Sequence, residues 1–211
     1  MIDIKTFTVG MMSTNSYVVT DRETQHTALI DPGCKDTGIT SALDTIGKEN
    51  VKYILLTHGH FDHIACAKEY ADMFGAEIVI SAEDAPFLSD NSLNLSVLLG
   101  PSQLKPFYAD IMLKDGDTLN LGDTTLSFLL TPGHTSGSGC FVSHSDKIIF
   151  SGDTLFCGSM GRTDFPTGDF FRMQKSLHRL RDLNGDYIVY PGHDISTTLS
   201  YERENNIYLR T

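Results

Sequence analysis

The sequence predicts an α/β fold in which two sheets lie inside a sandwich and helices cover them outside. Each half of the chain contains strand-like apolar segments followed by a segment with apolar residues at helical spacing. No Gly/Ser-rich or Pro-rich linker separates the two halves. Because 40% of the 211 residues are apolar, one substantial core is expected, and we predict a single domain over residues 1–211.

The first half has βαβ order after an opening β-meander. The turn Asp31-Pro32-Gly33 closes the meander, and Gly75 ends the second helical segment. The expected elements are strands over 2–9, 17–19 and 28–30, a helix over 36–50, a strand over 53–56, a helix over 63–74 and a strand over 78–80.

The second half repeats this style after a less regular segment over 83–113, which contains Pro86, Pro101 and Pro106. Irregular stretches of this length are usually functional or contain short helices, so we expect the segment to pass from a strand of the first half to one of the second and to form one wall of a pocket. The expected elements that follow are strands over 124–130, 139–142 and 147–150, a helix over 169–183, a strand over 187–190 and a terminal helix over 196–210.

Charge and hydropathy exclude several classes of protein. The chain has 27 acidic and 16 basic residues and a formal net charge of -11, so we expect no nucleic-acid partner. No apolar run approaches the roughly 20 residues that span a bilayer, and no signal-peptide core is evident, so we expect no membrane partner and a cytoplasmic location. Four cysteines without a C-x-x-C pair are expected to be reduced.

The strongest chemical signal is that four strand-like runs each end in a glycine beside a side chain that can bind a metal. Loops at the carboxyl ends of strands meet at one edge of a sheet, and glycine lets the backbone turn sharply there. These runs end at His58 and His60, at His134, at Asp153 and at His193. In the first of them, Asp62 lies on the same side of an extended loop as the two histidines, and His63 follows directly.

Seven candidate ligands are too many for one tetrahedral ion, so the sequence predicts two metal ions per chain. Imidazole and carboxylate donors without thiolate suit Zn, Fe or Mn. Two ions about 3.5 to 4 Å apart lower the pKa of a shared water toward 7, so hydrolysis through a metal-bound hydroxide is the expected reaction. We expect Asp62 and His63 to be catalytic as well as ligands. The predicted sites are His58, His60 and His134 for one ion and Asp62, His63 and His193 for the other, with Asp153 as the bridge.

The run Thr57-His58-Gly59-His60-Phe61-Asp62-His63, with His134, Asp153 and His193 downstream, resembles the metallo-β-lactamase superfamily. The segments 151–156 and 161–165 are similar to those of short-form, glyoxalase II-like (hydroxyacylglutathione hydrolase-like) enzymes. This resemblance implies a four-layer αββα sandwich and two metals, usually zinc and sometimes iron or manganese. It also implies hydrolysis of a small thioester such as S-lactoylglutathione.

The resemblance also indicates which activities within the superfamily fit this sequence. True metallo-β-lactamases lack the bridging carboxylate that Asp153 supplies, which makes a β-lactamase an unlikely match. Full-length glyoxalase II enzymes have a further helical domain that holds glutathione, and this chain ends about one helix after His193, so the thiol carrier stays open. Arg162 and Phe165 are the expected substrate-binding residues, with Arg162 on a carboxylate of the substrate. An ion pair of Arg162 with Asp164 or Asp169 is an equally good interpretation.

Two other functions stay open at this point. A sulfur dioxygenase acting on a persulfide would use one Fe(II) on His58, His134 and Asp153. A non-catalytic binding module of the same fold is the second alternative. The sequence leaves the physiological substrate, the native metal and the oligomeric state undetermined.

Overall fold

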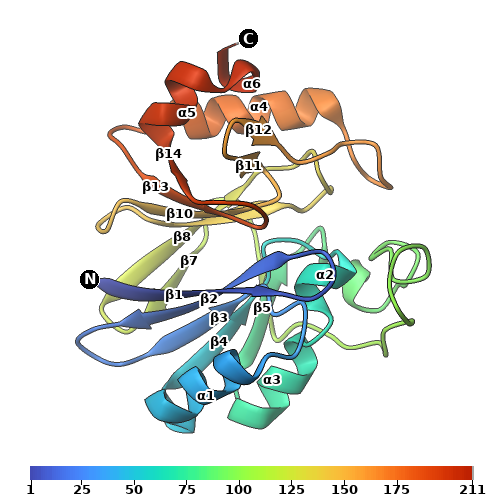
Figure 1. Cartoon of the computed structure of the whole chain (residues 1–211), viewed down its shortest axis with the longest axis vertical. Coiled ribbons are helices and arrows are strands. Elements are labelled where there is room, and N and C mark those ends of the chain that lie inside the picture. The colour runs from blue at the N-terminus through green and yellow to red at the C-terminus, as the bar shows by residue number, and fades with distance from the viewer. Residues whose placement is uncertain (211) are drawn as a thin grey trace.

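Two six-stranded sheets face each other in the computed structural model, which describes residues 1–210, and helices cover both outer faces (Figure 1). The first sheet contains, in spatial order, β1 (Ile2–Val9), β2 (Thr14–Asp21), β3 (Thr27–Ile30), β4 (Val51–Leu55), β5 (Glu77–Ser81) and β6 (Ile111–Leu113). The second contains β14 (Thr197–Thr198), β13 (Ile188–Pro191), β10 (Ile148–Gly152), β9 (Gly139–Ser143), β8 (Thr124–Leu130) and β7 (Thr118–Leu121). A small ribbon joins β11 (Leu155–Phe156) to β12 (Ser159–Met160).

Helices form the two outer layers, as Figure 1 shows. The first sheet is covered by α1 (Thr37–Ile46) and α3 (Ala67–Phe74), and the second by α4 (Phe170–Arg181), α5 (Leu199–Asn205) and α6 (Ile207–Arg210). Short helical turns occur at α2 (Phe61–Ile64), η1 (Lys48–Asn50) and η2 (Ala85–Leu88). The four-layer αββα sandwich predicted from the sequence is therefore confirmed.

Three apolar clusters fill the spaces between these layers. Between the two sheets, residues such as Tyr17, Leu55 and Phe150 are buried. A second cluster lies between the first sheet and its helices, and a third, which includes Leu177, lies under α4. Burial of this apolar surface is the main stabilising contribution, at roughly 25 cal/mol per Å².

Aspartate side chains cap the N-termini of the two longest helices, α1 and α4. Asp36 accepts hydrogen bonds from the backbone N–H groups of Gly38 and Ile39 at the start of α1. Asp169 does the same for Arg172 in α4, and Gly75 ends α3 in a left-handed conformation. These are common N-cap and C-cap arrangements, which satisfy backbone groups that the helix itself leaves unpaired.

The strand directions bring the ends of β8, β10 and β13 to one edge of the second sheet. β10 is parallel to β13, and both β8 and β10 are antiparallel to β9. In the first sheet, β3, β4, β5 and β6 are parallel neighbours. The loop after β4 is held to the second sheet, because the carbonyl of Thr57 accepts a hydrogen bond from the N–H of Gly139. The loops that follow β4, β8, β10 and β13, which contain the predicted ligands, therefore meet at one edge of the sandwich.

Several element predictions are wrong in detail. The expected helix over 63–74 is two helices, α2 and α3, because Cys66 donates its N–H to the carbonyl of Pro32 instead of continuing the helix. The segment over 83–113 returns to β6 in the first sheet, not to the second half. The terminal helix breaks at Asn206, whose side chain donates to the carbonyl of Ser159. Within residues 1–210, we find no helix with the length and apolarity needed to span a bilayer.

Candidate metal centre

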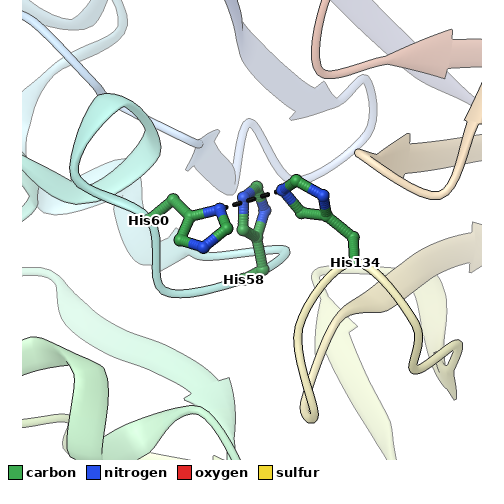
Figure 2. Close-up of side chains that lie close together, drawn as sticks. All are labelled: His58, His60 and His134. Atoms are coloured by element: carbon green, nitrogen blue, oxygen red, sulfur yellow. Dashed lines mark hydrogen bonds between the residues drawn. The ribbon is translucent and has the colours of Figure 1, made fainter. Parts of the chain in front are cut away.

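Three histidine side chains point toward one another at the edge where the strands end (Figure 2). His58 and His60 lie in the loop between β4 and α2, and His134 lies in the loop after β8. Nδ1 of His60 is 2.9 Å from Nε2 of His134, and one nitrogen of each ring lies within 4.8 Å of the others. This geometry suits one metal ion with three imidazole ligands.

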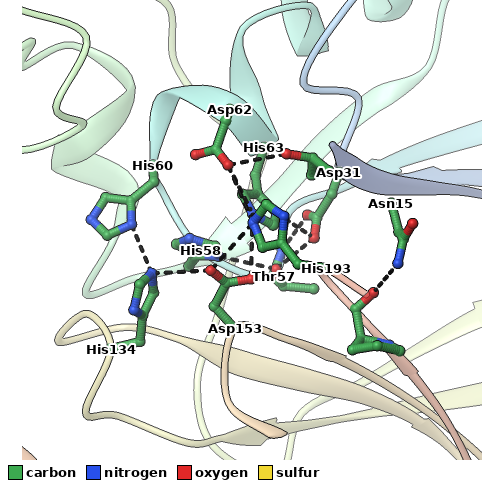
Figure 3. Close-up of polar contacts among 12 residues, drawn as sticks. Asn15, Asp31, Thr57, His58, His60, Asp62, His63, His134, Asp153 and His193 are labelled. Carbon is green, nitrogen blue, oxygen red and sulfur yellow. Dashed lines mark hydrogen bonds and ion pairs between the residues drawn. The ribbon is translucent and has the colours of Figure 1, made fainter. Parts of the chain in front are cut away.

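A second group lies directly beside the first (Figure 3). Asp62 and His63 belong to α2, and His193 follows β13. Nε2 of His193 is 3.4 Å from Nε2 of His63 and 3.4 Å from Oδ2 of Asp62. The ligand atoms of these three residues also converge within 4.8 Å, so a second ion could be held here.

Asp153 lies between the two groups. Its Oδ2 is 3.4 Å from Nε2 of His134, and its Oδ1 is 3.4 Å from Nε2 of His63. It also forms a third convergent group with His58 and His63. The structure therefore brings together all seven predicted ligands, with Asp153 in the position that a bridging ligand needs.

The donor set fits divalent metal ions on two observations. Among the described residues, Nε2 of His58 and Oδ1 of Asp153 are buried atoms without a hydrogen-bond partner, an arrangement that is costly unless another group satisfies them. Burial holds the pKa of both His58 and His60 well below the ordinary value. Both rings are therefore neutral at physiological pH, which is the form of imidazole that binds a metal.

The carboxylates give the second group a strong preference for positive charge. Burial alone would lower the pKa of His63, but the carboxylates of Asp62, Asp153 and Asp31 outweigh it and raise the pKa to about 10. Burial would likewise raise the pKa of Asp62, but His63 and His193 bring it well below the ordinary value. Cations are stabilised at this position.

Asp31 is a buried residue of the site that the sequence marked only as part of a turn. It accepts hydrogen bonds from Nδ1 of His63 at 2.9 Å and from the hydroxyl and backbone N–H of Thr57 at 2.6 and 2.8 Å. Such a contact orients a ligating imidazole and fixes its tautomer. Asp31 directly follows β3 at the same sheet edge as the ligands, and that position is the signal that could have identified it.

Asp84 is a second buried carboxylate that sequence analysis missed. It accepts hydrogen bonds from the N–H groups of Gly59 and Gly137 at 3.0 and 2.7 Å and from the Thr135 hydroxyl at 2.6 Å. Burial raises the pKa of Asp84 above its usual value. The residue ties the His58 and His60 loop to the loop of His134. No sequence motif links these distant segments.

Glycine is required where the backbone passes closest to the ligands. A Cβ at position 192 would lie 2.2 Å from Oδ1 of Asp153 and 2.8 Å from Cε1 of His63. Gly152, with φ +48°, would place a Cβ 2.3 Å from the Thr57 hydroxyl. The predicted need for glycine beside the ligands therefore has a steric basis at these two positions.

Five of the seven candidate ligands, all except His58 and His63, line a cavity of about 380 Å³, here called the metal pocket. Arg162 and Phe165 line it as well, so both predicted substrate-binding residues are near the ligands. The guanidinium of Arg162 lies 3.8 Å from the centre of the Phe165 ring and donates two hydrogen bonds to Asp164. The ion pair anticipated as an alternative for Arg162 is thus present. The other lining residues are Met12, Phe61, Leu95, Leu99, Phe156, Ser159 and Met160.

Comparison with known proteins agrees with this geometry. Hydroxyacylglutathione hydrolase GloC of Haemophilus influenzae is 34% identical over 212 residues, covering 100% of this chain and 99% of the relative. The solved structure of BLEG-1 B3 metallo-beta-lactamase matches with a TM-score of 0.88 and 31% identity, covering 99% of this chain and all of that one. TTHA1623 in a di-iron-bound form matches with a TM-score of 0.85 and 31% identity, covering 97% of this chain and all of that one.

The family model described as the metallo-beta-lactamase superfamily matches residues 9–193, a range that contains every candidate ligand from His58 to His193. This match and the full-length relatives agree with the αββα sandwich and with the histidine-rich site at its edge. The chain therefore belongs to the metallo-β-lactamase superfamily.

Proposed function

We propose that the chain is a metal-dependent hydrolase that cleaves a small thioester of the hydroxyacylglutathione type. The metal pocket is the observation that carries this proposal, because five of the seven candidate ligands line it together with apolar side chains, Ser159 and the cationic Arg162. A full-length relative named hydroxyacylglutathione hydrolase supports the thioester class. A thioester whose carbonyl lies between a polar and an apolar group fits a pocket with both polar and apolar walls.

His58, His60 and His134 would hold one ion, and Asp62, His63 and His193 the other, with Asp153 shared. When bound, two divalent ions lower the pKa of a shared water and so supply a nucleophile at neutral pH. Zinc suits this donor set, and the di-iron-bound relative supports iron as an alternative.

The chain's own side chains would position the substrate. Leu99, Met160 and Phe165 line the pocket and would exclude water from the apolar part of the thioester. The side chain of Arg162 is more than half exposed at the pocket, where a carboxylate of the substrate could compete with Asp164 for its guanidinium group. Ser159 is the one serine or cysteine among the described residues that line the pocket, and its hydroxyl contacts no base, so a protein nucleophile is not part of the proposal.

Two other reactions are alternatives that the same experiment separates. The likeness to BLEG-1 favours a lactam substrate as one alternative, and the carboxylate of Asp153 between the two ligand groups argues against it. A persulfide dioxygenase would need only His58, His134 and Asp153 and would leave the other four converging ligands without a role.

The test is a substrate panel run on protein purified without added metal and on the same protein after chelation. S-Lactoylglutathione, glutathione persulfide and a chromogenic cephalosporin are compared at equal concentrations. The proposal predicts release of thiol from the thioester at a rate at least a hundredfold above the other two reactions, with loss on chelation. Oxygen consumption with the persulfide, or lactam cleavage as the fastest reaction, would contradict it.

A further inference from the structure

A second cavity, of about 300 Å³, lies beside the metal pocket. Its walls come from the turn between β1 and β2, from Gly33 and Cys34 after β3, from residues 61–66 in and after α2, and from residues 101–104. Figure 1 shows the β1–β2 turn and α2 on the same side of the molecule as the green segment that follows η2. Four segments that are distant in sequence thus line a space that the reaction described above does not use.

This cavity adjoins the metal pocket. Met12, Phe61 and Asp62 line both spaces, and Asp62 is itself a candidate ligand. A substrate whose carbonyl lies at the ligands could therefore extend one arm into each space. The thioester bond has two such arms, the acyl group and the thiol.

The lining of the second cavity is mainly apolar, with Thr14, Ser102 and Asp62 as its polar members. Val9, Met11, Ala65 and Leu104 contribute hydrocarbon and thioether surface. Burial raises the pKa of the Cys66 thiol to about 11, so this side chain is neutral at physiological pH. Among the described lining residues, Asp62 at the junction is the one charged group, whereas the metal pocket contains Arg162.

This contrast decides which arm occupies which space. A glutathione-like thiol has carboxylates and an ammonium group, and burying these without partners is unfavourable. Arg162 offers a cationic partner for a carboxylate in the metal pocket, and the described residues that line the second cavity include no lysine or arginine. An apolar acyl group has the opposite preference, because its hydrocarbon gains free energy from leaving water.

We propose that the second cavity, here called the acyl cavity, binds a straight-chain apolar acyl group, so the preferred substrates are thioesters of medium-chain carboxylic acids with a carboxylate-bearing thiol. The inference rests on the proposed thioester hydrolysis and specifies its substrate class. In that reaction the C–S bond breaks, the oxygen of water joins the acyl carbon, and a carboxylate, a thiol and one proton leave.

The first test measures kcat/KM for acetyl, butanoyl, hexanoyl and octanoyl thioesters of glutathione with the metal-loaded protein. Burial of each added methylene should raise kcat/KM about fourfold until the cavity is full. Ala65→Leu fills the cavity and should lower the octanoyl-to-acetyl ratio at least tenfold, and Ser102→Leu should lower it independently. Ser41→Leu on the exposed face of α1 is the matched control, and it should leave the ratio unchanged.

The second test does not depend on turnover. Cys34 and Cys66 both line the acyl cavity, so octanoate should slow their alkylation at least fivefold, and acetate should not. The half-buried Cys157, outside this cavity, is the internal reference. Thioester hydrolysis with equal kcat/KM for all chain lengths and no protection by octanoate would overturn the acyl cavity alone. Protection by octanoate without hydrolysis of any thioester would support the cavity and contradict the proposed function.

Discussion

The carboxylate of Asp31 accepts a hydrogen bond from Nδ1 of His63 at 2.9 Å, and the opposite nitrogen of that ring, Nε2, faces His193 and Asp153. Asp31 thereby selects which nitrogen of His63 is free for a metal. The same carboxylate holds Thr57, which directly precedes His58. One residue outside the ligand set thus orients ligands in both groups.

Replacing Asp31 with Asn should weaken metal binding without removing a ligand. Loss of the carboxylate partner lets the His63 ring rotate and lowers its basicity, and changes of this kind typically cost 10-fold to 100-fold in metal affinity. Competition with a chelator of known affinity measures the effect. Asp21→Asn changes another buried, hydrogen-bonded carboxylate far from the ligands and should leave the affinity unchanged.

Asp153→Ala should reduce the occupancy of both metal groups together. Its two oxygens face His134 and His63, which belong to different groups. His134→Ala should lower mainly the occupancy of the group that contains His58 and His60. Elemental analysis of the two variants measures the difference. Two ions per chain in active Asp153→Ala protein would show that this residue does not bridge.

Arg162→Ala should raise KM about tenfold for thioesters with a carboxylate on the thiol and leave KM for neutral thioesters nearly unchanged, because a charge-assisted hydrogen bond is lost. Asp164→Asn should lower KM for the same carboxylate-bearing thioesters, since it frees the Arg162 guanidinium from its present partner. Arg172→Ala, an exposed arginine of α4, is the control. Equal effects on charged and neutral substrates would remove Arg162 from the binding site.

Stability at acidic pH should depend on Asp21. Burial alone would raise its pKa, but hydrogen bonds from Thr24 and Thr124 outweigh this and lower the pKa to about 2. Since the unfolded value is about 3.9, the ionised carboxylate stabilises the fold above about pH 4, and this contribution is lost as the pH falls toward 2. As the pH is lowered from 4 to 2, the urea concentration at the midpoint of unfolding should fall less steeply for Asp21→Asn than for the parent protein. Parallel curves for variant and parent would contradict this assignment.

The ligand set could be predicted from the sequence because each ligand follows an apolar run and a glycine. That pattern can be recognised locally in the sequence. Because β10 and β13 are parallel, the ligands that follow them lie at the same edge of the sheet. Asp84 lacks such a signal, because its partners Gly59 and Gly137 are 25 and 53 residues away and only the packed fold brings them together.

Helix boundaries and the path of the long segment depended on tertiary contacts that the sequence does not display. The helix expected over 63–74 breaks because Pro32, from the preceding turn, accepts the N–H of Cys66. The segment over 83–113 returns to the first sheet because Ile111 pairs with Val79. Its expected contribution to the pocket wall is nevertheless seen in Leu95 and Leu99.

Metal titration of chelator-treated protein, with thioester hydrolysis as the readout, tests the central claim most directly. The seven converging ligands predict that activity rises with added Zn²⁺ and reaches its plateau at two equivalents per chain. The rate should fall at acidic pH, because protons compete with the metal ions for the ligand imidazoles. Full activity at one equivalent of Fe²⁺, with oxygen consumed in proportion to substrate, would contradict a dinuclear hydrolase.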